Sequence, residues 1–131
     1  MTERSEEAIQ EEIVQFLQLE GWTVFVFAPP RNRRGGLAGS VPSGWPDLLA
    51  VKENMLVSRR PPGFVNKRPA YLHLEVKRPG GRLSPAQKVM HENLVSLGCR
   101  VYTVTCAEDC AVALSAWGCE VRTRFRHEGE P

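Results

Sequence analysis

Two acidic residues and a lysine have the types and the spacing that hydrolysis of a phosphodiester needs. Asp47 follows Pro46 at the head of a short apolar run, and Glu75 and Lys77 stand two residues apart in a second run. Side chains alternate along a β-strand, so Glu75 and Lys77 would share one face of theirs. Taken alone, these residues have ordinary explanations: a turn-forming Asp after proline, and a surface ion pair. Together, inside the most basic part of the chain, they predict a catalytic site.

The chemistry explains why these residue types are needed. Hydrolysis requires an activated water, neutralised charge in the transition state and a stabilised leaving oxygen. Carboxylates are hard oxygen ligands that suit Mg²⁺ or Mn²⁺. We expect Asp47 and Glu75 to hold such an ion, with the backbone carbonyl of Val76 as a further ligand. Lys77 would orient the attacking water or stabilise the phosphoryl oxygens, and no small-molecule cofactor is expected.

Hydrophobic periodicity and chain breakers predict the elements that must position these residues. Helices are expected over 5–20, 85–97 and 108–117, and strands over 22–27, 47–51, 71–77 and 100–105. A loop rich in Gly and Arg would span 31–46, and a basic stretch interrupted by prolines would span 53–69. Ser84, Pro85 and Gln87 form a capping-box pattern at the start of the second helix. This order predicts an α/β fold in which helices flank a mixed central β-sheet.

Length and composition set the remaining limits. The 131 residues fit one domain, which we place at 1–118, with a poorly ordered tail over 119–131. No apolar run approaches the roughly 20 residues of a membrane helix. The acidic, polar N-terminus is unlike a secretory signal, so we expect a cytoplasmic protein with no membrane contact. The four cysteines contain no CxxC pair, and free thiols are therefore expected instead of a zinc site.

Positive charge is concentrated between residues 28 and 83. This segment has eleven Lys or Arg against three acids, a net charge of +8, whereas the whole chain carries only +2. A concentrated basic region favours a polyanionic partner, most simply nucleic acid. Alternatively, these are solvated loop charges. The residues expected to contact nucleic acid are Arg31, Arg33, Arg34, Arg59, Arg60, Lys67, Arg68, Arg78 and Arg82.

The order of these motifs resembles a known family. The PD element at 46–47, followed by EVK at 75–77, resembles the signature of the PD-(D/E)XK nucleases. The run LEVKRPGGRLSPAQ over 74–87, the GWPD element over 44–47 and the acidic first helix resemble the VRR-NUC branch of that superfamily. The resemblance covers about residues 5–105. It implies a restriction-endonuclease-like core and a metal-dependent DNA endonuclease that leaves a 5′-phosphate and a 3′-hydroxyl.

The resemblance also implies that a glutamate of the first helix completes the metal site. Helical angles favour Glu6, which lies along the apolar stripe of that helix, and Glu12 at the edge of the stripe is the alternative. Glu6 can also be an ordinary first-turn acid favoured by the helix dipole. Gln87 either only caps its helix or, as the family pattern implies, supports the catalytic site.

The histidines and Trp45 have mainly structural interpretations. We interpret His73 as a structural residue, and His91 and His127 as surface residues. Trp45 either packs its own loop or stacks on a base.

We expect a homodimer that acts on branched DNA. Resolving a four-way (Holliday) junction needs two symmetric cuts, which a twofold dimer supplies. Stand-alone members of the family that this sequence resembles are generally dimeric. The stretch 52–68 is the candidate for dimer contact or junction binding, although its apolar residues can instead cover the sheet of one subunit. The alternatives to a nuclease are a catalytically inactive nucleic-acid-binding module of the same fold, and a small structural protein with incidental motifs.

Overall fold

A computed structural model of the chain describes residues 4–27, 41–53 and 69–125. Three helices and four strands lie within these segments, and each differs by at most one residue at either end from the range that the sequence predicts. None of the helices in the described part is long and apolar enough to cross a membrane. In chain order the elements are α1 (Glu6–Leu19), β1 (Thr23–Val26), β2 (Leu48–Lys52), β3 (Ala70–Val76), α2 (Pro85–Ser96), β4 (Val101–Val104) and α3 (Ala107–Trp117).

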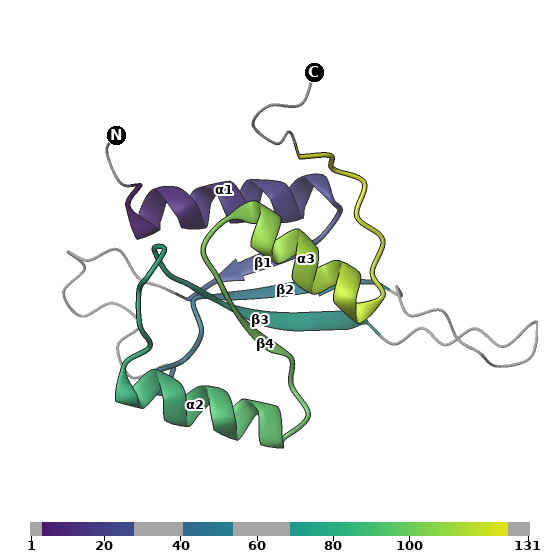
Figure 1. Ribbon diagram of the computed structural model, residues 1–131. Helices are drawn as coiled ribbons and strands as arrows, with labels where there is room; N and C mark the ends of the chain where they lie inside the picture. Colours follow the sequence, from purple (N-terminus) through teal and green to yellow (C-terminus); the bar gives the residue numbers. More distant parts are fainter. Residues whose placement is uncertain (1–3, 28–40, 54–68, 126–131) are drawn as a thin grey trace, which may run out of the picture.

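The four strands form one mixed sheet in the order β1-β2-β3-β4. The pairs β1–β2 and β2–β3 are antiparallel, and β3–β4 is parallel because α2 crosses over between them. Figure 1 shows α1 and α3 on one face of the sheet and α2 on the other. The architecture confirms the predicted α/β fold with a mixed sheet between helices, and it is consistent with a restriction-endonuclease-like core.

The main core lies between the sheet and the pair α1 and α3. The apolar stripe of α1 is buried as its helical spacing predicts, and alternate residues of β2 and β3 face it across the layer. The buried residues of this layer include Ile9, Ile13, Phe16, Leu17, Leu48, Ala50, Leu72, Leu74 and Val76. β3 is buried on its other face too, where His73 and Glu75 lie, so the acidic residue of this strand sits inside the molecule.

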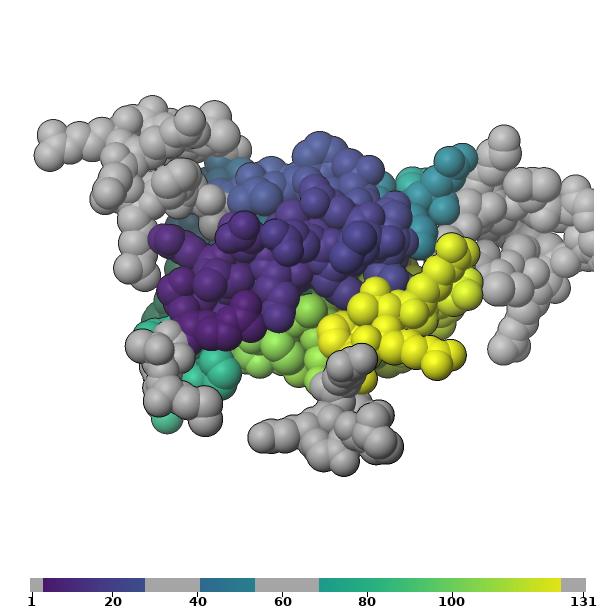
Figure 2. Space-filling view, turned by 90° about the horizontal axis from the view of Figure 1, so that it is seen from above, coloured from purple at the N-terminus to yellow at the C-terminus, as the bar shows by residue number. Residues whose placement is uncertain are grey.

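Residues 119–125 differ from the expectation of a poorly ordered tail. Cys119 is buried, and the ring of Phe125 packs 5.6 Å from that of Phe16. The carboxylate of Glu20 accepts hydrogen bonds from the backbone N–H groups of Arg122 and Thr123 at 2.6 and 3.1 Å. Figure 2 shows this yellow segment lying against the purple-to-blue α1. The prediction is therefore wrong for these residues, whereas residues 126–131 lie outside the described part of the chain.

Candidate active site

Strand register brings Asp47 and Glu75 together. Leu48 pairs with Leu74 in the antiparallel ladder, so the next position places Asp47 opposite Glu75. The Asp47 carboxylate accepts a hydrogen bond of 2.8 Å from the backbone N–H of Val76, and the Asp47 backbone carbonyl accepts one of 2.7 Å from Phe27. Asp47 is thus fixed between β1 and β3, at the end of the sheet where β3 finishes.

Because Pro46 has no N–H, the backbone carbonyl of Val76 beside this pair lacks a ladder hydrogen bond. Continued by one more step, the ladder would set Val76 opposite Pro46, which has no N–H to donate. The N–H of Val76 is taken by the carboxylate of Asp47 instead. The Val76 carbonyl therefore receives no ladder donor from this side, which is what a further oxygen ligand of a metal ion requires.

Glu75 is 1% exposed and hydrogen-bonded to the carboxyl group of Asp47. Burial is the largest cause that raises the pKa of Glu75 to about 9, followed by the hydrogen bond and the negative charge of Asp47. The charge of Lys77 lowers this pKa, and that of Glu6 raises it further. At neutral pH, and without a cation, Glu75 therefore keeps its proton and can donate it in a hydrogen bond to Asp47. A divalent cation suits the place of that proton, since it neutralises both groups through hard oxygen ligands.

A glycine sets the turn before Asp47 against the start of α2. Gly44 has φ +82°, and a Cβ built on it would lie 2.2 Å from the backbone oxygen of Ala86. Gln87 forms the predicted capping box with Ser84: its Oε1 accepts from the backbone N–H of Ser84 at 2.8 Å, and its own N–H donates to Ser84 Oγ at 3.1 Å. The capping role of Gln87 is confirmed, and any role at the site falls to its side-chain Nε2.

A comparison with protein families matches the VRR-NUC domain to residues 37–108. This range is more than half of the chain, and it contains the Asp47–Glu75 pair with Lys77 and Gln87. The chain belongs to the VRR-NUC family. VRR-NUC proteins are nucleases that act on DNA, and they generally use divalent metal ions. Searches of curated proteins and of solved structures found no significant match.

The two candidate glutamates of the first helix, Glu6 and Glu12, have different surroundings. Glu6 lies near enough to Glu75 for its charge to raise the pKa of that residue. Glu12 is engaged elsewhere: it pairs with Arg4 at 3.2 Å and accepts from the backbone N–H of Ala107 at 3.3 Å. Among residues 4–27, 41–53 and 69–125, no three His, Cys, Asp or Glu side chains are close enough together to hold a metal ion. Asp47 and Glu75 meet, and Glu6 stands near them without completing a three-ligand cluster.

His91 is not the surface residue that we predicted. It is 9% exposed, and its Nε2 lies 3.1 Å from Oε1 of Glu75. Burial is the largest cause that lowers its pKa, Asp47 raises this pKa and Lys77 lowers it, which favours the neutral ring. In the tautomer that carries its proton on Nε2, the ring donates a hydrogen bond to Glu75. The burial of His91 could have been inferred from the sequence, because His91 lies four residues after Gln87 and three before Leu94, on one face of the helix.

Trp45 and His73 pack against each other beside the Asp47–Glu75 pair. The Trp45 ring packs edge-to-face with the rings of His73 and Phe27, with distances between ring centroids of 5.3 and 6.1 Å. His73 is 5% exposed, as its structural interpretation predicts. Trp45 therefore packs its own loop onto the sheet.

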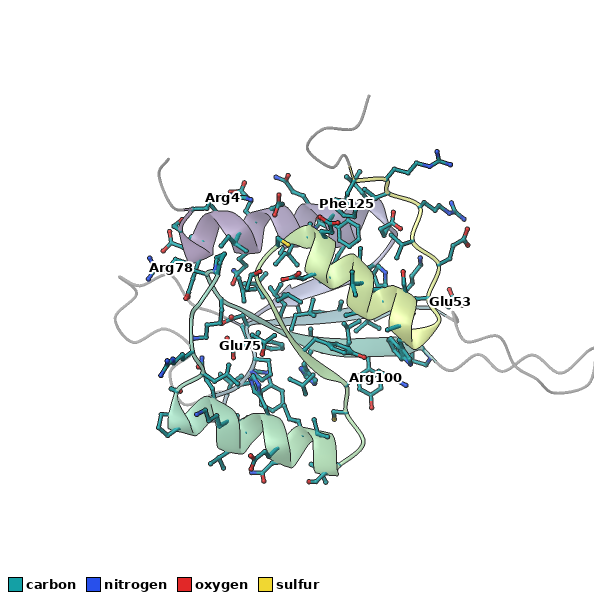
Figure 3. All side chains as sticks on the ribbon, in the orientation of Figure 1. Arg4, Glu53, Glu75, Arg78, Arg100 and Phe125 are labelled. Carbon is teal, nitrogen blue, oxygen red and sulfur yellow. The ribbon has the colours of Figure 1, made fainter. Side chains whose placement is uncertain are left out.

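The predicted DNA-contacting residues divide by position along the sheet. Arg78 and Arg82 are exposed in the turn after β3, at the end that holds Glu75, and Figure 3 shows Arg78 and Glu53 at opposite ends. Segment 28–40 follows Phe27, which bonds to Asp47 at this same end. Glu53 and Pro69, the described residues on either side of 54–68, lie at the far end, about 17 Å away for a five-residue strand. Outside the described residues lie Arg31, Arg33, Arg34, Arg59, Arg60, Lys67, Arg68 and His127.

Proposed function

We propose that this VRR-NUC protein is a Mg²⁺- or Mn²⁺-dependent DNA endonuclease built on Asp47, Glu75 and Lys77. The observation that carries the proposal is a contact between two carboxyl groups: the buried Glu75 of β3 lies beside the half-buried Asp47, which precedes β2, and the pKa of Glu75 is raised to about 9. Strongly perturbed carboxyl groups of this kind gather at functional sites. An ionisable pair with Lys77 beside it is the arrangement that phosphodiester hydrolysis needs.

Each residue has a defined role in the proposed reaction. Asp47, Glu75, the Val76 carbonyl and Glu6 would hold the ion, which supplies water activation and charge neutralisation when bound. Lys77 lies within electrostatic range of Glu75 and would orient the attacking water or stabilise the phosphoryl oxygens. Donors on Gln87 Nε2 would support the site from the first turn of α2, and the products would carry a 5′-phosphate and a 3′-hydroxyl.

DNA would approach the end of the sheet where β3 finishes. Arg78 and Arg82 are exposed there, and they offer donors that suit phosphate oxygens. The arginines at 31, 33 and 34 follow β1 at the same end and would extend this contact. The stretch that contains Arg59, Arg60, Lys67 and Arg68 is proposed as a further DNA contact or as part of the dimer interface.

We also propose that the protein acts on branched DNA as a twofold dimer. One chain carries one Asp47–Glu75 pair, and paired cuts in a four-way junction need two such sites. The described surface also exposes large apolar side chains, among them Phe25 at 49% and Tyr71 at 45%. Light scattering at micromolar concentration tests this proposal: twice the chain mass is expected, and a persistent mass of one chain under cleavage conditions would exclude the dimer.

Cleavage of labelled duplex, flap and four-way-junction DNAs, with and without Mn²⁺, tests the activity. The wild-type protein should cut only with metal and prefer the junction, whereas Asp47→Ala and Lys77→Ala should bind DNA but not cut it. Glu92→Ala, which removes an exposed acid of α2, is the matched control and should cut normally. DNA binding with no cleavage under any metal would instead favour a catalytically inactive binding module.

A further inference from the structure

α2 faces the sheet with an unusual residue. Its buried side chains are His91 and Leu94, although a helix that packs on a sheet normally presents apolar residues there. A buried imidazole is costly unless its polar atoms are hydrogen-bonded. Nε2 of His91 meets that need at 3.1 Å from Glu75 Oε1.

Glu75 is held from two sides by different elements. Asp47, which precedes the neighbouring strand β2, is hydrogen-bonded to its carboxyl group, and His91 reaches it from α2. With only 1% of Glu75 exposed, these two contacts set the orientation of the carboxyl group. The ring is itself fixed, because the Ser84–Gln87 capping box and the close approach of Gly44 anchor the first turns of α2.

We propose that His91 is a positioning residue for Glu75: its Nε2–H would hold Oε1 and leave the second carboxylate oxygen free for the cation that Asp47 and Glu75 would bind. The inference rests on the proposed metal-dependent function and adds a residue to it. Ligand carboxylates are themselves hydrogen-bonded by supporting side chains, and loss of such a support typically weakens metal affinity by about 10- to 100-fold.

Titration calorimetry with Mn²⁺ and no DNA tests this role without relying on cleavage. His91→Leu keeps the apolar packing and removes the donor, so its Mn²⁺ dissociation constant should rise by about 10- to 100-fold. His91→Gln places an amide donor near the position of Nε2 and should recover most of the affinity. His91→Asn is too short to reach Glu75 and should behave like His91→Leu. Leu94→Ala disturbs the other buried position of α2 and should lower the melting temperature while leaving the Mn²⁺ affinity unchanged.

The outcomes separate this inference from the proposed function. Wild-type Mn²⁺ affinity in His91→Leu, or equal affinities in His91→Gln and His91→Asn, would overturn the positioning role and leave the nuclease proposal standing. The Gln and Asn pair decides the question if His91→Leu does not fold. A wild-type protein that binds no Mn²⁺ would overturn both.

Discussion

Replacing Glu75 with glutamine should make the metal-free protein more stable while removing its activity. The folded chain keeps the Glu75 proton up to about pH 9, whereas the unfolded carboxyl group loses it near pH 4.5. Between these values the unfolded state binds fewer protons, so the free energy of unfolding of the wild type falls as the pH rises, by at most about 1.4 kcal/mol per pH unit. At pH 7 this sets an upper limit of about 3 kcal/mol on the destabilisation, since a buried carboxylate can also recruit water as it ionises.

The glutamine fits the same hydrogen bonds without titrating. Its carbonyl oxygen can accept from His91 Nε2, and its amide group can donate to Asp47. Urea unfolding at pH 5, 6, 7 and 8 in the absence of metal should show Glu75→Gln gaining on the wild type as the pH rises. Glu92→Gln, at an exposed position of α2, should show no such trend. A difference between Glu75→Gln and the wild type that stays constant from pH 5 to pH 8 would refute the reasoning.

Three further predictions follow from described contacts. The double variant Arg78→Gln, Arg82→Gln should flatten the slope of the logarithm of the DNA-binding constant against the logarithm of the salt concentration by about 1.8, since each phosphate that is no longer neutralised reduces this slope by about 0.9. Fluorescence anisotropy across a salt series measures the slope, and an unchanged slope would show that neither arginine contacts the DNA backbone. Burial raises the pKa of Glu20, but the hydrogen bonds from Arg122 and Thr123 outweigh burial, so the pKa is lowered. The ionised Glu20 therefore stabilises the folded chain above the ordinary carboxyl range, and this stabilisation is lost as the pH falls through the folded pKa. Glu20→Gln should therefore lower the free energy of unfolding at pH 7 by about 1–3 kcal/mol in urea titration, with a smaller loss in acid, and an unaltered value would show that the tail does not depend on this carboxylate. Gly44→Ala should reduce both melting temperature and cleavage, because it combines a positive φ with a Cβ in the backbone of α2, and a variant with wild-type melting and cleavage would contradict this account of the turn.

Patterns among residues close in sequence were enough to predict most of the fold. The stripe of α1 and the capping box at Ser84 each fix a helix from residues close in sequence, and both are found as predicted. Alternation in β3 also placed Glu75 and Lys77 on one face, and Pro46 marked the strand start that brings Asp47 opposite Glu75. These features depend on periods of 2 and 3.6 residues, which one sequence contains.

Long-range contacts could not be predicted in the same way. The Glu20 carboxylate accepts a hydrogen bond from the backbone N–H of Thr123, 103 residues further along the chain. No local pattern in either segment predicts this contact. His91 is brought to Glu75 by the way α2 crosses over between two parallel strands, which a helical period alone does not specify. The different surroundings of Glu6 and Glu12 likewise depend on how α1 packs against the rest of the molecule.

Mn²⁺-dependent cleavage of a labelled four-way junction by the wild type and by Glu75→Gln tests the catalytic role of Glu75 directly. Because this variant should be at least as stable as the wild type, an absence of cleavage cannot be attributed to unfolding. We expect metal-dependent products from the wild type, none from Glu75→Gln, and similar DNA affinity for both. Continued cleavage by Glu75→Gln would contradict the assignment of the active site.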